Sequence, residues 1–449
     1  MTPPRGAMPP SRSHQFAFWL FALGLTAFLV LPASTLFALG IAYDAPGGTP
    51  LAKLHPGSYL MLTAWFMALC SHGNPLGAAL AQLRGQRALA LYLAAMLALF
   101  GYALLRHGMG GAAYLIDTHL MAAVAVLVMQ QLGPRRQRQT LMLMALVLVL
   151  NAALGIGEAA LQARLLPLTI GGHAEVPEDY FRASALMGHP LQNAQQTATL
   201  LPVLLLLPLA AGMRCALVLW LGLALLAFGG RVSLLLAVLM YGGLFVAQAF
   251  KRLVEGRLNY RQVTGGAIGV LLAAAAMVAV VVSTGLGERI FASLSWDNSA
   301  SVRVRVWEVF GYMNDVQLIF GATADDIEVL YQHLGLDARF EAIENFWLLA
   351  WVQYGAVGFS LFAFGLGCAL CFLWGQSFGV FRVALVLTLL VSSTTNSLTA
   401  KTSAWLLFMV AVQAAAHLRP RPQLHGPWHS PWHHPRAPLP FALQRGLPT

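Results

Sequence analysis

Ser299-Ala300-Ser301-Val302-Arg303-Val304-Arg305-Val306-Trp307-Glu308 belongs to a polar interval, residues 285–344, that separates two long apolar runs. The interval closes with Glu341-Ala342-Ile343-Glu344-Asn345, after which the sequence becomes apolar again. Nearly all the rest of the chain is apolar enough to dissolve in hydrocarbon. A long stretch rich in Arg, Asp and Glu can therefore supply the polar side chains that a reaction needs. We interpret it as a substrate-handling loop on the outer face of a membrane.

The composition supports a membrane protein. The chain is 58% hydrophobic and only 10% charged, whereas soluble proteins carry about 25% charged residues. Its mean hydropathy is +0.68. At about 20 apolar residues per crossing, the 449 residues accommodate about 12 spans. We therefore predict an all-α, polytopic membrane protein with about 12 transmembrane helices and one large loop outside the membrane.

The apolar runs give the expected order of the chain. We predict transmembrane helices at 16–43, 57–71, 88–105, 111–132, 140–161, 194–213, 215–228, 232–250, 263–284, 345–374, 380–394 and 403–417. Residues 1–284 then hold nine helices and a second polar loop at 162–193. The large loop covers 285–344, three more helices follow within 345–417, and the Pro-rich tail 418–449 is expected to be disordered.

Charge sets the expected orientation. Basic residues concentrate in short loops that all fall on one side when the N-terminus is cytoplasmic, while most acidic residues fall on the other side. This is the distribution that the positive-inside rule predicts. Both termini should then be cytoplasmic and both polar loops should face outward. The net charge of +10 thus indicates membrane orientation and not nucleic-acid binding, because no basic stripe lies on a soluble domain.

No metal or cofactor is expected. The outer loops contain no Asp-x-Asp, and the four cysteines lie in or beside apolar runs, where small packing residues are the simplest account of the Cys368–Cys371 spacing. The histidines of the tail leave two interpretations, metal capture and a plain cytoplasmic tether.

Four arginines on the predicted outer face are candidates for binding an anion: Arg182, Arg231, Arg303 and Arg305. Guanidinium is the side chain suited to bidentate phosphate recognition. An arginine at a membrane border also occurs simply because it snorkels or forms a local salt bridge. Four on one face, beside lipid, favour a lipid-linked pyrophosphate as ligand.

Several stretches resemble the O-antigen ligase / O-antigen polymerase family of bacterial inner-membrane proteins. They cover residues 181–359, in the order that the family shows. The stretches are Arg182 with Gly188-His189-Pro190-Leu191-Gln192-Asn193-Ala194, Gly230-Arg231-Val232-Ser233-Leu234-Leu235, Ser301-Val302-Arg303-Val304-Arg305-Val306-Trp307, Leu318-Ile319-Phe320-Gly321, and Glu344-Asn345-Phe346-Trp347-Leu348 with Tyr354-Gly355-Ala356-Val357-Gly358.

The resemblance implies glycosyl transfer at the periplasmic face of the inner membrane. The donor would be an undecaprenyl-pyrophosphate-linked glycan, the partners would include membrane lipid and other polysaccharide assembly proteins, and the reaction would invert the anomeric carbon. The substrate-binding residues would be Arg182, Arg231, Arg303, Arg305 and Asn345.

Two residues are candidate catalytic bases. Glu344 occupies the position at which the family's ligases carry a histidine, and this departure favours a polymerase-type member. A carboxylate can accept the proton of an attacking hydroxyl. His189 is the second candidate. The structural alternatives are a helix-start acid for Glu344 and a packed loop histidine for His189.

Three other functions are compatible with the sequence. The same chemistry would serve a ligase that transfers glycan to lipid A–core. A transporter or lipid flippase would need ionisable groups within the membrane, where Asp117, His119 and Glu158 are the candidates; the sequence shows no internal repeat typical of duplicated transporter bundles. A non-catalytic scaffold for polysaccharide assembly is the third.

Overall fold

The computed structural model describes residues 12–45, 47–170, 173–174, 181–256, 260–261, 264–265, 275, 279, 302, 304–336 and 343–417. Apart from positions 264, 265, 275 and 279, the predicted span 263–284 lies outside the described residues, as does the start of the large loop. Arg303 and the tail 418–449 also lie outside them. All described residues belong to one compact unit, Met1–Leu418.

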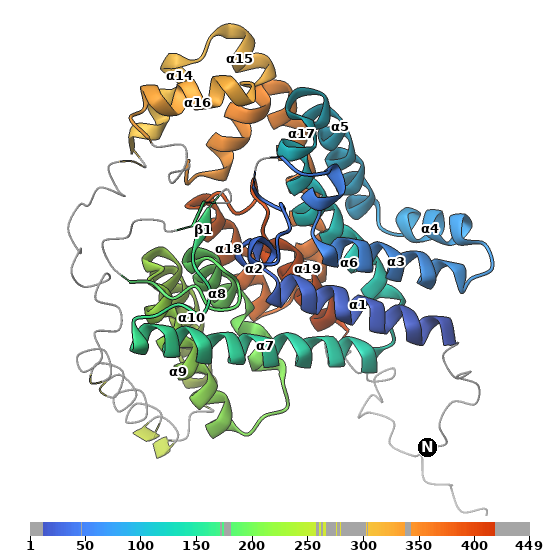
Figure 1. Cartoon of the computed structure of the whole chain (residues 1–449). Coiled ribbons are helices and arrows are strands. Elements are labelled where there is room, and N and C mark those ends of the chain that lie inside the picture. The colour runs from blue at the N-terminus through green and yellow to red at the C-terminus, as the bar shows by residue number, and fades with distance from the viewer. Residues whose placement is uncertain are drawn as a thin grey trace, which may run out of the picture. The chain divides into compact units, whose positions relative to one another are not determined.

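The described chain is helical, as the composition predicts, apart from one antiparallel pair of two-residue strands (Figure 1). The elements are α1 (Arg12–Val30), α2 (Ala33–Ala38), η1 (Pro50–Lys53), α3 (Pro56–Cys70), α4 (Pro75–Arg84), α5 (Arg87–Tyr114), η2 (Leu115–Leu120), α6 (Met121–Gln131), α7 (Pro134–Leu161), β1 (Thr169–Ile170), β2 (His173–Ala174), α8 (Pro190–Leu206), α9 (Ala211–Phe228), α10 (Arg231–Val254), η3 (Val306–Glu308), α14 (Val309–Tyr312), α15 (Asp315–Phe320), α16 (Ala324–His333), α17 (Phe346–Gln376), α18 (Val380–Ser393) and α19 (Ala404–Ala416).

Among the described residues, six helical stretches are long and apolar enough to cross a membrane. They are Ser13–Val30, Arg87–Gln131, Pro134–Leu161, Ala211–Phe228, Arg231–Val254 and Phe346–Gln376. Three shorter apolar helices, α3, α18 and α19, accompany them. The face of α10 exposes large apolar side chains such as Leu235, Phe245 and Phe250, which is the surface that a helix presents to lipid.

Prolines change several of the predicted boundaries. One span is predicted at 16–43, but the structure has two helices there. The first ends at Val30, because Pro32 takes an extended conformation and precedes the short α2. The span predicted at 194–213 begins earlier and stops at Leu206, since Leu207 is extended before Pro208. Pro75 starts an additional helix, α4, where we expected a short connection, and the Asn74 side chain caps this helix by accepting the Gly77 N–H.

Two of the long helices are broken at single glycines. Gly108 interrupts α5 at φ 64° and ψ −171°, between the spans predicted at 88–105 and 111–132. Gly355 interrupts α17 with nearly the same angles, φ 60° and ψ −172°. Positive φ is a conformation that glycine adopts without the penalty other residues meet. The two broken helices pack against each other along their lengths.

The main hydrophobic core surrounds α19. The side chains from Trp405 to Val412 are at most 1% exposed on every face of this helix, as expected for a helix that is apolar all round. It contacts α6, α7, α8, η2 and α17.

The described part of the large polar interval is a helical segment with an apolar core of its own. Val309, Leu330 and Leu334 are buried in it and pack on Leu348 and Val352 of α17. In Figure 1, α14, α15 and α16 gather beside the start of α17.

Candidate functional site

A cavity of about 360 Å³, lined by both polar and apolar groups, lies where several segments far apart in the sequence meet. Its wall includes the turn between α1 and α2, Tyr43 and Asp44, the start of α8, Glu344, and the connection 395–403 between α18 and α19. The second part of α5, beyond the break at Gly108, closes another side with Gly110 and Tyr114.

The loop before α8 is held in place by two side chains of α7. The Glu158 carboxylate accepts hydrogen bonds from the N–H groups of Leu165 (2.8 Å), Ser184 (2.8 Å) and Ala185 (2.9 Å). Elsewhere on the same helix, Asn151 accepts from the Leu186 N–H and donates to the Asn193 side chain over 2.8 Å. The loop that presents His189 is thus fixed by buried polar contacts and is not free to move independently of α7.

His189 is the N-cap of α8. Its Nδ1 accepts the N–H of Leu191 at 3.2 Å, so the neutral ring carries its proton on Nε2. Burial among protein atoms, with the positive charges of Arg182 and Arg164 nearby, lowers the pKa of His189 to about 4. The ring is therefore neutral at neutral pH, lines the cavity and has a donor on its outer nitrogen.

Glu344 lines the same cavity and is partly exposed. The segment that carries it is fixed by the next residues. The Phe346 N–H donates to the Thr395 carbonyl at 2.9 Å, and Asn345 caps α17 by accepting from the N–H groups of Trp347 and Leu348 at 3.0 and 3.2 Å. Asn345, predicted to bind substrate, uses its side-chain oxygen for this cap and does not line the cavity.

Two of the predicted arginines lie near the start of α8. Arg182 is close enough to His189 to depress its pKa, and its carbonyl accepts both Nε–H and Nη2–H of Arg164. Arg231 begins α10 immediately after Gly230, whose backbone packs so tightly on Ala194 of α8 that an added Cβ would lie 2.3 Å from the Ala194 Cβ. Neither arginine lines the cavity itself.

Arg305 belongs to a different part of the described chain. It is exposed, immediately before η3, and lies against Gly335 in the helical segment formed by α14 to α16. The structure therefore brings Arg182, His189 and Arg231 around the start of α8. Glu344 shares the cavity with His189, while Arg305 stays with the separate apolar cluster.

The connection between α18 and α19 was not singled out from the sequence, although it supplies much of the cavity wall. It reads Thr394-Thr395-Asn396-Ser397-Leu398-Thr399-Ala400-Lys401-Thr402-Ser403. It is pinned by η2: the Thr118 hydroxyl donates to the Ala400 carbonyl at 2.8 Å and accepts the Thr402 N–H at 3.1 Å. A run of hydroxyl and amide residues between two short apolar helices was the signal available in the sequence.

The buried carboxylates Asp117 and Glu158 bond to different parts of the protein and do not pair with each other. Asp117, on the π-helical η2, accepts from the Tyr43 hydroxyl at 3.0 Å, from the His55 N–H and from the Ser58 hydroxyl. Glu158 binds the loop before α8. His119 contacts the Leu398 carbonyl at 2.8 Å and the Tyr92 hydroxyl at 3.0 Å. All three ionisable groups that a transporter would need are thus bonded to groups of the protein.

Within the described ranges, no three His, Cys, Asp or Glu side chains form a group that could hold a metal ion. The chain matches no protein-family model, and no curated protein matches it significantly.

Proposed function

We propose that this chain is a bacterial inner-membrane glycosyltransferase that polymerises undecaprenyl-pyrophosphate-linked glycan at the periplasmic face. It would serve the synthesis of a cell-surface polysaccharide such as O-antigen or exopolysaccharide. The observation that carries the proposal is the shared cavity of Glu344 and His189. These residues lie in two separate motifs that resemble the O-antigen ligase / polymerase family. The motifs are far apart in the sequence, and both residues line one cavity with many polar side chains in its wall, inside an otherwise apolar helical protein.

The proposed reaction is a single displacement. A sugar hydroxyl of the acceptor attacks the anomeric carbon of the donor, and Glu344 accepts the hydroxyl proton as the new glycosidic bond forms. The bond from the anomeric carbon to the pyrophosphate oxygen breaks, and its electron pair stays on that oxygen. The pyrophosphate leaves still attached to its lipid. Arg182 and Arg231 lie beside the start of α8 and outside the cavity wall, and their positive charges offset from that distance the charge that develops on the leaving group. His189, neutral with a proton on Nε2, acts as a hydrogen-bond donor in this state.

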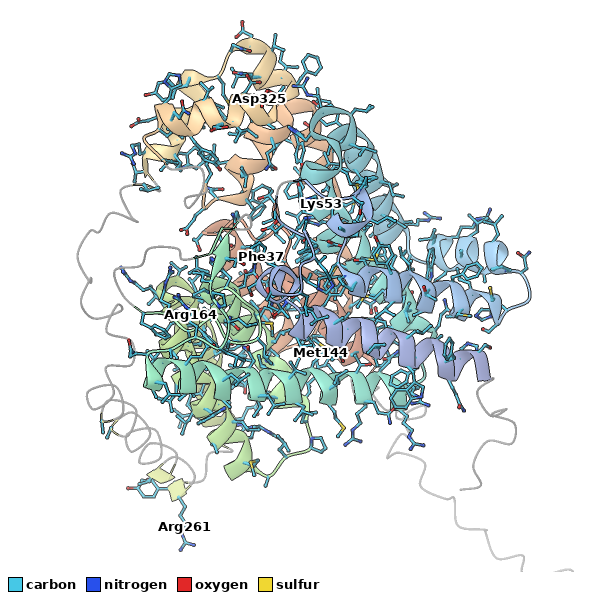
Figure 2. The ribbon with its side chains drawn as sticks, in the orientation of Figure 1. Phe37, Lys53, Met144, Arg164, Arg261 and Asp325 are labelled. Carbon is cyan, nitrogen blue, oxygen red and sulfur yellow. The ribbon has the colours of Figure 1, made fainter. Side chains whose placement is uncertain are left out.

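The test replaces the carboxylate without changing its shape. Glu344→Gln in purified full-length protein should lower the rate of polymer formation from a lipid-pyrophosphate-linked donor by about 10²–10⁴-fold, the usual contribution of a general base. Asp325→Asn is the matched control, because Asp325 lies exposed on α16 (Figure 2) and is not one of the residues that line the cavity. A folded Glu344→Gln protein that polymerises at the rate of the unmodified chain would refute the proposed role.

A ligase would use the same residues on a different acceptor. Product analysis separates the two: free polymer on the lipid carrier supports a polymerase, and glycan attached to lipid A–core supports a ligase. We favour the polymerase because Glu344 stands where the resembling ligases have histidine.

One observation favours transport as a second candidate. Both α5 and α17 are broken by glycines close to the cavity, and Gly110 and Gln353 near those breaks line it. Discontinuous helices at a central site are typical of secondary transporters. Vesicles that contain the protein and an external lipid-linked glycan distinguish the two functions: transport moves the glycan unchanged, whereas the transferase consumes the pyrophosphate bond.

A further inference from the structure

Lys401 is the lysine of the cavity wall, and the fold holds it in position. Its Nζ donates to the Tyr43 carbonyl and lies 4.3 Å from the centroid of the Tyr43 ring. The Tyr43 hydroxyl in turn donates to Asp117, which is 1% exposed and is also bonded by Ser58 and His55. A buried carboxylate therefore fixes a tyrosine, and the tyrosine fixes the lysine at the cavity.

The start of α8 contributes to another part of the same wall through Gly188, His189, Leu191 and Gln192. At the start of α8, Pro190 has no N–H and the Leu191 N–H is donated to His189 Nδ1. The Gln192 N–H and the helix dipole are left to favour an anion. A helix start alone is not evidence of a ligand. Next to it, however, lies Ser34, whose side chain is 3% exposed and whose hydroxyl has no hydrogen-bond partner in the described part of the chain. A Cβ on Gly188 would lie 2.7 Å from that hydroxyl oxygen.

A buried hydroxyl without a partner destabilises the folded protein, because it has lost its hydrogen bonds to water. Ser34 lines the cavity beside the helix start, so a bound oxygen anion would satisfy it. The lysine, the hydroxyl and the helix start are three groups of the type that phosphate oxygens accept hydrogen bonds from.

We infer that Lys401, the Ser34 hydroxyl and the start of α8 form a binding site for one phosphate group of a pyrophosphate. This inference rests on the proposed function and deepens it, because it assigns the leaving group to residues that the four-arginine hypothesis does not include. Asp44 and Glu344 also line the cavity. Their charges oppose every phosphate group in the cavity, so the site is expected to hold one phosphate and not both, and Glu344 is left for the acceptor side.

The charge of Lys401 is suited to this role. Burial lowers the pKa of Lys401, and Lys53 adds to that effect, while the carboxylates of Asp44 and Asp117 act in the opposite direction. Burial removes the water that would stabilise the positive charge of Lys401. The negative charge of a phosphate in the cavity would stabilise it instead. The ligand and the lysine would thus stabilise each other's ionised forms.

The experiment measures binding without turnover. The full-length protein in phosphatidylcholine nanodiscs is titrated with inorganic pyrophosphate and, separately, with undecaprenyl pyrophosphate. Lys401→Gln should weaken binding at least tenfold, since glutamine keeps an N–H for the Tyr43 carbonyl but removes the charge. Lys401→Arg should stay within threefold of the unmodified protein. Lys53→Gln is the control. Lys53, labelled in Figure 2, bonds the Ala42 carbonyl and is not one of the residues that line the cavity.

The two probes separate the possible sources of the phosphate. Lys401-dependent binding of the lipid form alone assigns the site to a lipid-linked headgroup, and binding of both forms assigns it to pyrophosphate in general. Either result supports the anion site. It is overturned if Lys401→Gln binds both probes as tightly as the unmodified protein does, or if the unmodified protein binds neither.

Two further variants guard against misfolding and against confusion with the proposed reaction. Ser34→Ala should weaken binding three- to tenfold, and unchanged affinity in this variant would overturn the site even if Lys401→Gln does not fold. Glu344→Gln should bind pyrophosphate as well as or better than the unmodified protein, and weaker binding would count against the site. If Lys401-dependent binding is found in a protein that never transfers glycan, the proposed function fails and the anion site stands.

Discussion

At the scale of single residues, Glu158 shows how a charge inside an apolar helix can be structural. It is 6% exposed and accepts three backbone N–H groups of the loop that leads to His189. One of those N–H groups belongs to Ala185, which has φ 39°, an unusual value for a residue with a Cβ. The carboxylate thus compensates for a strained loop conformation, and the loop in turn carries a candidate catalytic side chain.

We predict that Glu158→Gln lowers the free energy of unfolding by about 3 kcal/mol, because the amide has one acceptor oxygen where the carboxylate has two. Thermal unfolding of the purified protein in detergent measures this change. Glu255→Gln is the control and should alter stability by about 0.5 kcal/mol or less, since the side chain of Glu255 makes a 3.8 Å ion pair with the exposed Lys251. Equal melting temperatures for the two variants would show that Glu158 does not hold the loop.

At the scale of elements, the apolar pattern predicts where helices lie better than where they break. The helices predicted at 57–71, 140–161, 232–250 and 380–394 agree with α3, α7, α10 and α18 to within several residues. A uniform apolar run does not reveal that Gly108 or Gly355 takes a positive φ, because that depends on the neighbouring segment. The candidate site divides in the same way. Glu344 and His189 could be found from local motifs, whereas Lys401 joins them only through its tertiary contact with Tyr43 and through the hydrogen bonds of Thr118 to the adjacent residues Ala400 and Thr402.

The break in α17 has an identifiable cause. Gly355 lies against Gly321, at the end of α15: a Cβ on Gly355 would be 2.3 Å from the Gly321 nitrogen, and a Cβ on Gly321 would be 2.2 Å from the Gln353 carbonyl oxygen. The Ala322 N–H also donates to the Val352 carbonyl at 2.8 Å. Two glycines therefore allow the backbone of the helical segment to cross that of α17.

We predict that Gly355→Ala destabilises this crossing by about 2–4 kcal/mol, through the positive φ and through overlap with backbone atoms that have no alternative position. Limited proteolysis of residues 304–336, together with thermal unfolding, detects the loss of docking. Gly375→Ala, near the end of the same helix, has open space around its Cβ and should change stability by about 1 kcal/mol or less. Identical protease resistance in both variants would mean that the close contact is not required.

At the scale of the whole described unit, two long helices relate the cavity to the charge pattern. In α5 the stretch from Arg87 to His107 rises about 30 Å at 1.5 Å per residue, which matches the hydrocarbon thickness of a bilayer. At its far end Arg106 donates to the Gly321 carbonyl at 2.7 Å, and His107 contacts the Gln353 carbonyl at 2.8 Å. The Arg87 end of this helix and the helical segment 304–336 are therefore at opposite ends of one membrane-length element.

The helix α7 repeats that arrangement, with Arg135 and Arg138 in its first turns and Glu158, which fixes the cavity loop, in its last. If basic residues mark the cytoplasmic side, the end of α7 that carries Glu158 and holds the loop before α8 lies on the opposite side of the membrane. We predict that a cysteine at Asp325 in a cysteine-free chain reacts with a membrane-impermeable maleimide in intact cells, whereas one at Gly85 reacts only after the inner membrane is permeabilised. Both positions are exposed, so accessibility within the protein does not decide the result. If only Gly85→Cys is labelled in intact cells, the orientation is opposite to the predicted one. A reaction that needs a periplasmic donor could then not take place in this cavity.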